Sequence, residues 1–333
     1  MPPMNARNMV VLFADPVVIA PAFCTTMTVL KFKPANTYVT VFCVDFNDEK
    51  YQTAVSVFSA LGASVTLQQV DSAADFDDRV WRTSLGMATW GRLFLDKLLP
   101  RGLNRVLYLD CDTLVQSNLA PLLNADLGTT SVGACKDQFQ YMSAAVEQRR
   151  TELGLSPEGD YFNAGVMLLD WKPVIDQNLL AQARDLLRKH RRSLKLRFAD
   201  QDILNLMLNG NWRELDPAWN LQSFAMAVTT FRQPRIAHFV GEQKPWSKHC
   251  PAHLLKFRRQ YAAMQRMAGP LAQDFKTLPF ITRMATGYSR NIFRQVVSHL
   301  TFKAAEQSSR KTASRNRLEL LFKTYDEQNG AEL

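Results

Sequence analysis

The first third of the chain alternates short apolar segments with helical segments, and this alternation restricts the fold more than any other feature. Apolar segments rich in β-branched residues occupy Met9–Ala14, Tyr38–Val44 and Arg105–Leu109, and Ser64–Leu67 is a further candidate strand. Strands that alternate with helices form mainly parallel sheets with helices on both faces, so the sequence predicts an α/β fold. Ligands of such sheets bind where the strands end at their carboxyl side.

Helical spacing of apolar residues predicts the remaining elements. Val55, Phe58 and Leu61, for example, fall on one stripe of a helix. The predicted helices are Glu49–Leu61, Leu85–Leu99, Pro173–Arg192 and Ala199–Leu208, and the later predicted strands are Tyr161–Asp170 and Arg235–His238.

The length of 333 residues allows one large α/β domain with an appendage. A hydrophobic content of 47% and a charged content of 21% indicate a globular protein. We expect a catalytic domain over residues 1–250 and a basic helical extension over 251–333. Within that extension, the polar stretch Ser308–Ser314 is predicted to be a flexible linker.

The cysteines and the N-terminal segment predict an intracellular location. Asp15, Pro16 and Pro21 interrupt the apolar residues 9–30, and no basic leader or cleavage site accompanies them, so we expect no export signal. The cysteines are odd in number and scattered, which favours free thiols in a reducing compartment. They are Cys24, Cys43, Cys111, Cys135 and Cys250. The expected location is cytoplasmic, with a peripheral position on the cytoplasmic membrane face as the further expectation.

Two carboxylates stand where the apolar strand Arg105–Leu109 ends. Asp110 and Asp112 are two residues apart, so in an extended chain both side chains point the same way. Ionised carboxylates this close repel each other unless a cation compensates, and a hard divalent ion is the usual one. The pattern therefore predicts a metal site, with a turn and a helix cap as the alternative.

Positive charge is concentrated near the C-terminus. Residues 256–317 contain thirteen Lys or Arg and two Asp or Glu, in a chain of net charge +9. Residues 286–303 have apolar and basic positions at helical spacing, which is typical of a helix lying in an anionic membrane surface. A helix packed on the catalytic domain is the alternative. Nucleic-acid binding is disfavoured, since residues 281–317 hold only three aromatic residues for base stacking.

Five separated motifs follow one another in a recognisable order. They are Phe-Ala-Asp (13–15), Trp-Gly-Arg (90–92), Leu-Asp-Cys-Asp (109–112), Phe-Asn-Ala-Gly-Val (162–166) with Asp-Gln-Asp (200–202), and His-Phe-Val-Gly-Glu-Gln-Lys-Pro-Trp (238–246). In order and content the set resembles glycosyltransferase family 8, and within it the bacterial lipopolysaccharide and lipooligosaccharide galactosyl- and glucosyltransferases. The resemblance covers roughly residues 9–250 and implies a GT-A type nucleotide-sugar-binding fold.

The resemblance implies a metal and a donor site. Asp110 and Asp112, flanking Cys111, would hold Mn²⁺ together with His238, and Mg²⁺ is the alternative ion. Gly241 would let the backbone approach the donor diphosphate, and Lys244 would neutralise a phosphate oxygen.

Further site residues are implied around the nucleoside and the donor sugar. Asp15 matches the position that contacts the nucleoside, and Arg92 matches an arginine on the donor phosphate or sugar. Val18 stands near where the family places an aromatic residue that stacks on uracil, and a valine covers a base without stacking. The positions implied around the donor sugar are Asp137, Asn163, Asp200 and Gln201, and with Asp202, a candidate nucleophile, they are the candidate catalytic residues.

The function implied is retaining, Mn²⁺-dependent transfer of galactose or glucose from a UDP-sugar to a glycan or lipid-linked saccharide. Front-face attack steadied by Gln201 is the favoured route, and a covalent route through Asp202 or Gln201 is the alternative. The rival enzyme class is a nucleotidyltransferase that makes nucleotide sugars. Such enzymes carry a Gly-rich basic loop, whereas residues 15–24 contain no Gly, Lys or Arg. A non-catalytic protein that binds nucleic acid through its basic tail is the remaining alternative.

Overall fold

The protein is described by a computed structural model that covers residues 8–76, 87–156, 159–190, 196, 198–228, 233–241, 243–247, 250–275 and 303–329. Its centre is a seven-stranded sheet with the order β3-β2-β1-β4-β7-β6-β8. The strands are β1 (Asn8–Ala14), β2 (Thr37–Val44), β3 (Val65–Val70), β4 (Arg105–Leu109), β6 (Val132–Lys136), β7 (Phe162–Asp170) and β8 (Arg213–Glu214). Strands β3, β2, β1 and β4 run parallel, and β7 is antiparallel to both β4 and β6. The predicted, mainly parallel α/β sheet is confirmed.

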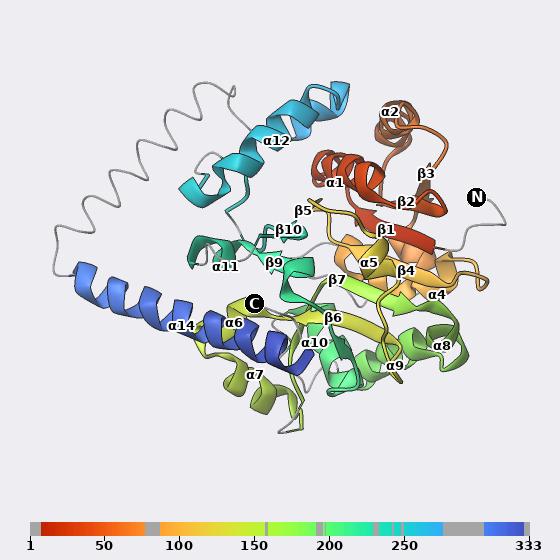
Figure 1. Cartoon of the computed structure of the whole chain (residues 1–333). Helices are drawn as coiled ribbons and strands as arrows, with labels where there is room; N and C mark the ends of the chain where they lie inside the picture. Colours follow the sequence, from red (N-terminus) through yellow and green to blue (C-terminus); the bar gives the residue numbers. More distant parts are fainter. Residues whose placement is uncertain are drawn as a thin grey trace.

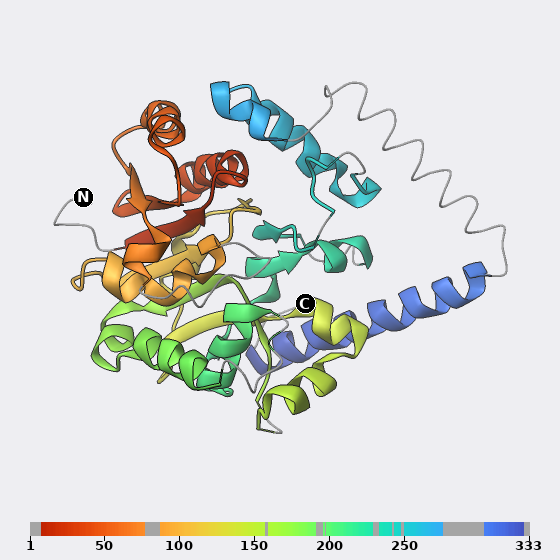
Figure 2. The same ribbon diagram turned by 180° about the vertical axis from the view of Figure 1, so that it is seen from behind.

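Helices cover both faces of this sheet (Figures 1 and 2). The α-helices described before residue 230 are α1 (Ile19–Phe32), α2 (Asp48–Ser59), α3 (Ser72–Asp75), α4 (Leu95–Leu98), α5 (Ala120–Leu123), α6 (Gln138–Ser143), α7 (Val146–Leu153), α8 (Trp171–Asp176), α9 (Leu179–His190), α10 (Ala199–Leu208) and α11 (Ser223–Val228). Successive strand residues point to opposite faces, so each face buries its own core.

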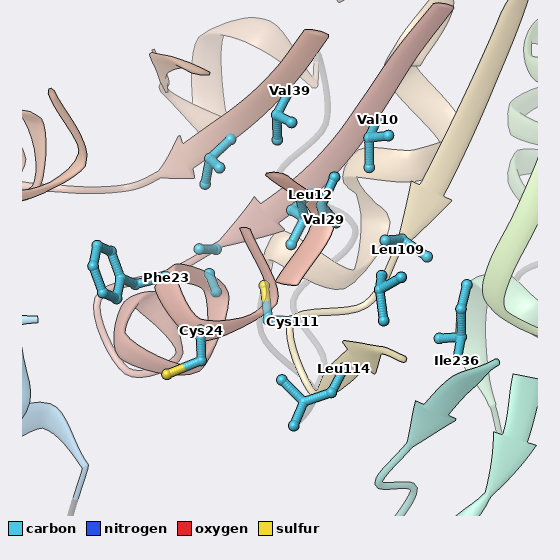
Figure 3. Packing of buried hydrophobic residues seen from close by; sticks show 14 of the residues in the cluster. Val10, Leu12, Phe23, Cys24, Val29, Val39, Leu109, Cys111, Leu114 and Ile236 are labelled. Carbon is cyan, nitrogen blue, oxygen red and sulfur yellow. The ribbon is translucent and has the colours of Figure 1, made fainter. Parts of the chain in front are cut away.

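The two cores follow this alternation along β1. Val10 and Leu12 belong to the same buried cluster as Phe23 and Val29 of α1, and Figure 3 shows part of this cluster. Met9, Val11 and Phe13 belong to the second core with the 3₁₀ helix η1 (Met87–Phe94) and with α4, α8, α9 and α10. Strands buried on both faces read as continuous apolar runs, which is why these segments could be located from the sequence.

A small second sheet brings the segment around His238 to the Asp-Cys-Asp segment. Its order is β5-β10-β9, formed by β5 (Thr113–Val115), β10 (Ile236–His238) and β9 (Leu221–Gln222). His238 pairs with Thr113, and the backbone N–H of Phe239 donates to the carbonyl of Asp112 at 2.9 Å. This antiparallel pairing joins residues more than a hundred positions apart in the sequence.

Two predicted helices differ from the observed ones. The segment predicted as Leu85–Leu99 is a 3₁₀ helix, η1 (Met87–Phe94), that continues into α4. Gly91 there approaches β1 so closely that a Cβ would lie 2.1 Å from the Phe13 ring, so local packing overrides the α-helical pattern. The segment predicted as Pro173–Arg192 is split into α8 and α9, because Asn178 adopts a left-handed conformation at φ 53°.

The described elements after residue 250 pack onto the α/β fold. η3 (Ala252–Leu254), α12 (Leu255–Gln265) and η4 (Gly269–Asp274) contribute Phe257, Tyr261 and Leu271 to the core around α1. The last described helix, α14 (Lys303–Asn329), packs through Leu318, Leu321 and Phe322 against the α11 region and lies along α6 (Figures 1 and 2). The domain boundary at residue 250 stays a prediction.

The predicted flexible linker Ser308–Ser314 is wrong, because these residues lie inside α14. The stretch is polar but contains no Gly or Pro, and strong helix formers flank it. Most of the predicted membrane-surface helix 286–303 lies outside the described residues, and membrane binding stays a prediction. Within the described ranges, no helix combines the length and apolarity that crossing a membrane requires. All five cysteines are buried, and none of them takes part in a disulfide.

Candidate functional site

A pocket of about 510 Å³ opens where β1 and β4 end. Its volume falls within the range of small-molecule binding sites. Every site residue predicted from the sequence except Asp202 contributes to its lining. Those residues are Asp15, Val18, Arg92, Asp110, Cys111, Asp112, Asp137, Asn163, Asp200, Gln201, His238, Gly241 and Lys244.

The three predicted metal ligands converge in this pocket. Ligand atoms of Asp110, Asp112 and His238 all lie within 4.8 Å of one another. The His238 Nε2 atom lies 3.3 Å from Asp112 Oδ1 and 3.6 Å from Asp110 Oδ2. Two carboxylate oxygens and one imidazole nitrogen form a donor set that suits a divalent ion such as Mn²⁺.

Neighbouring side chains orient both carboxylates. Tyr108 donates to Asp110 Oδ1 at 2.7 Å and Arg92 Nη2 donates to the same oxygen at 2.9 Å. Lys244 Nζ binds Asp112 Oδ2. One oxygen of each carboxylate is therefore held by the protein, and the other faces His238. The residues thus fit a cation at this point.

Electrostatics keep Asp112 ionised. Burial alone would raise its pKa, but the Lys244 ammonium and His238 outweigh burial and hold that pKa below its usual value. Arg92, which is 5% exposed, forms an ion pair with Asp200, whose Oδ2 lies 2.7 Å from the Arg92 Nε atom. Burial raises the pKa of Asp200 to about 7 against the opposing effect of Arg92.

A bulge in β7 makes room for the metal ligands. Ala134 of β6 pairs with Met167, but Cys135 pairs with Asn163, so β7 bulges over residues 164–166. A Cβ at Gly165 would lie 2.2 Å from His238 Cε1 and 2.6 Å from Asp110 Oδ2. Only glycine fits behind the candidate metal site.

A hydrogen-bonded group forms the side of the pocket assigned to the donor sugar. Asp137 Oδ2 accepts from Asn163 Nδ2 at 3.3 Å and from Gln201 Nε2 at 3.0 Å. Gln201 Oε1 accepts from the backbone N–H of Ala164 at 3.0 Å. These contacts hold three predicted sugar-site residues in fixed orientations at the pocket wall.

Asp202 is the predicted residue that the structure does not bring into the pocket. It is fully buried, and its carboxylate binds Arg149 and accepts from Tyr161 Oη at 2.7 Å and from the backbone N–H of Phe198 at 2.7 Å. Asp202 lies two residues after Asp200 on helix α10, and side chains two residues apart on a helix point in different directions. Asp200 therefore lines the pocket while Asp202 does not.

The Arg149–Asp202 ion pair predicts a large stability effect. Arg149→Met leaves a buried carboxylate without its cation and should lower the free energy of unfolding by about 3–5 kcal/mol. Arg149→Met combined with Asp202→Asn removes the charge as well, and an amide can still accept from Tyr161. Urea unfolding should therefore show a smaller loss for the double variant than for Arg149→Met alone. Equal losses would contradict a charge-based role for the pair.

The side of the pocket that the sequence assigns to the nucleoside is built on the β1–α1 turn. Asp15 Oδ1 accepts from the backbone N–H groups of Val17 at 2.8 Å and Val18 at 3.1 Å, which fixes the start of α1. Across the pocket, Gly241 has φ +87°, a conformation that glycine adopts without strain. Cys111 donates its thiol to the carbonyl of Phe13 at 3.0 Å and ties the Asp-Cys-Asp segment to β1.

The sequence analysis missed several residues that support the site. They are Gly165, Asn220, Tyr108, which orients Asp110, and Arg149, which binds Asp202. A glycine inside an apolar strand does indicate a bulge or a close approach, so Gly165 carried a readable signal. Asn220 carried none, because an isolated asparagine after a tryptophan fits many structures.

Comparison with known proteins agrees with this geometry. The profile of Glycosyl transferase family 8 matches residues 18–250. General stress protein A of Bacillus subtilis is 28% identical over 203 residues, covering 56% of this chain and 68% of that protein. The lipopolysaccharide 1,2-glucosyltransferase of Escherichia coli is 30% identical over 176 residues, and the chain spans about half its length, 49%.

The fold comparison points the same way. The crystal structure of the galactosyltransferase LgtC with donor and acceptor sugar analogues superposes with a TM-score of 0.66 at 22% identity, covering 77% of this chain and 95% of that one. This likeness confirms the GT-A type fold. With the profile match over most of its length, the chain belongs to glycosyl transferase family 8.

Proposed function

We propose that the protein is a retaining hexosyltransferase that moves galactose or glucose from a UDP-sugar to a glycan or lipid-linked saccharide, with Mn²⁺ as its cofactor. The observation that carries this proposal is the convergence of Asp110, Asp112 and His238 with the Asp137–Asn163–Gln201 group in one pocket. The candidate metal ligands and the candidate sugar-binding group line the same pocket, as the transfer of a sugar from a diphosphate requires.

The residues have distinct roles in this proposal. Asp110, Asp112 and His238 would hold Mn²⁺, which supplies Lewis-acid stabilisation of the charge on the departing diphosphate. Lys244, which already binds Asp112 in the structure, would add a second positive charge beside the phosphates. Gly241 lets the backbone approach them, and Asp15 and Val18 lie on the nucleoside side.

Retention results either from attack on the same face of the sugar as the leaving group or from two successive inversions through a covalent intermediate. A covalent route needs a nucleophile on the opposite face. The carboxylate of Asp202 is bound by Arg149 and Tyr161 behind the pocket, which argues against that role. Gln201 lines the pocket with its amide orientation fixed, which supports its role in steadying the positively charged sugar centre.

The donor class can be tested directly. Release of UDP from UDP-galactose and UDP-glucose should require Mn²⁺ and should distinguish the two sugars. A thermal-shift screen of nucleotide sugars with Mn²⁺ then identifies the donor that stabilises the protein most. Absence of UDP release and of any shift with both donors would overturn the proposed donor class.

The sugar-site assignment predicts a specific kinetic effect. Gln201→Ala should lower kcat far more than it raises the donor KM, because the amide contact matters chiefly in the transition state. Steady-state kinetics with the identified donor measure both constants. A large rise in KM with unchanged kcat would show that Gln201 holds only the ground-state sugar.

A further inference from the structure

Asn220 links the candidate metal site to the candidate sugar site without lining the pocket. It is fully buried, in η2 (Pro217–Asn220), directly before β9. Its Oδ1 lies 2.9 Å from His238 Nδ1, and its Nδ2 donates to Asn163 Oδ1 at 3.0 Å. One buried amide therefore contacts a metal ligand with one end and a sugar-site residue with the other.

The orientation of this amide follows from backbone groups. The N–H of Gly165 can only donate, and it donates to Asn163 Oδ1 at 3.0 Å. The Asn163 atom facing Asn220 is thus an oxygen, so Asn220 must present its nitrogen there. The Asn220 oxygen then faces His238.

This orientation selects one tautomer of His238. An amide oxygen accepts hydrogen bonds, so His238 Nδ1 must carry a proton and donate it to Asn220. In the neutral ring the lone pair is then on Nε2, the nitrogen that faces Asp112 and Asp110. That is the ring form able to bind a cation.

The hydrogen bonds continue to the sugar site. Asn163 Nδ2 donates to Asp137, which also accepts from Gln201. The N–H of Ala164 fixes the Gln201 oxygen in the same way that the N–H of Gly165 fixes Asn163. Consecutive backbone N–H groups of the β7 bulge thus orient both amides.

We propose that Asn220 is a positioning residue that holds His238 in the Nδ1-protonated tautomer and joins the cation site to the sugar site through Asn163. The inference rests on the proposed function for the identity of the cation. Partners of this kind typically contribute 10–100-fold to metal affinity.

The tautomer can be measured without metal. The chain has five histidines, so ¹H–¹⁵N correlation spectra of imidazole-labelled protein are tractable, and loss of one signal in His238→Gln assigns the residue. In spectra of the neutral imidazole ring, wild-type His238 should carry its proton on Nδ1. Protonation at Nε2 in the wild type would overturn the inference whatever the metal.

Metal binding provides the second test. Mn²⁺ titrations followed by electron paramagnetic resonance, with and without UDP, should show a dissociation constant about 10–100-fold higher for Asn220→Ala. Asn220→Asp keeps an oxygen opposite Nδ1 and should stay closer to the wild type than Asn220→Ala. The matched control is Asn205→Ala, because Asn205 is an equally buried amide that bonds Phe162 and the backbone of Gln201 but not His238.

The outcomes separate this inference from the proposed function. Wild-type affinity in Asn220→Ala, or an equal loss in Asn205→Ala, would overturn the role of Asn220 and leave the metal site standing. Failure of the wild-type protein to bind Mn²⁺ both with and without UDP would overturn the metal site itself. It would also overturn the link between the metal site and the sugar site through Asn220. If Asn220→Ala does not fold, the wild-type tautomer and the Asn220→Asp titration still decide.

Discussion

Asp112→Asn is expected to lower glycosyl transfer by roughly a thousandfold or more, because charge stabilisation by a coordinated cation contributes several kcal/mol. One carboxylate oxygen of Asp112 faces His238, and Lys244 binds the other. His238 and Lys244 together keep the Asp112 carboxylate ionised. An amide has similar size but no charge, so the variant should retain the fold and lose cation affinity. Activity assays with Mn²⁺ measure the first effect, and Mn²⁺ titrations measure the second.

Controls separate the metal from the fold. Asp126→Asn removes an exposed carboxylate that only caps a turn at Gly128, and it should leave transfer unchanged. EDTA should abolish transfer by the wild type, and Mn²⁺ should restore it better than Ca²⁺. Full activity in chelator, or an active Asp112→Asn variant, would rule out the metal hypothesis.

Gly165→Ala should be nearly as damaging, although glycine to alanine is the smallest possible side-chain addition. The new methyl group would lie 2.2 Å from His238 Cε1 and 2.6 Å from Asp110 Oδ2, far inside contact distance. Either the two ligands move apart or the β7 bulge shifts, and a displacement of about 1 Å in a catalytic site can cost roughly a hundredfold in rate. Overpacking of this kind also costs about 1–3 kcal/mol of stability.

The matched control is Gly102→Ala, since a Cβ at Gly102 has no neighbour within 4 Å. Mn²⁺ affinity, transfer rate and urea unfolding should all change in Gly165→Ala and stay near wild type in Gly102→Ala. Wild-type Mn²⁺ affinity in Gly165→Ala would mean that the bulge does not support the ligand set.

Local sequence patterns located the elements that carry the site. β1, β2 and β4 are buried on both faces, so their apolar runs could be recognised without knowledge of their neighbours. The same patterns failed where packing competes with local preference. Gly91 presses against Phe13 in a 3₁₀ helix, and Asn178 breaks the long helix predicted over 173–192. Polar composition alone suggested a linker at Ser308–Ser314, although nothing in that stretch opposes a helix.

The sequence by itself located β1, β2, β3, β4, β7 and β10, and it determined the family and the residue types that could bind a metal. These depend on local pattern and on motifs with fixed spacing. Only the tertiary structure decided which of these residues meet. The antiparallel pairing of β10 with β5 carries His238 to Asp112, and the bulge of β7 brings Asn163 to Asn220. It also placed Asp202 behind the pocket in an ion pair with Arg149. Contacts between residues distant in the chain depend on how the sheets pair, and no local pattern encodes that pairing.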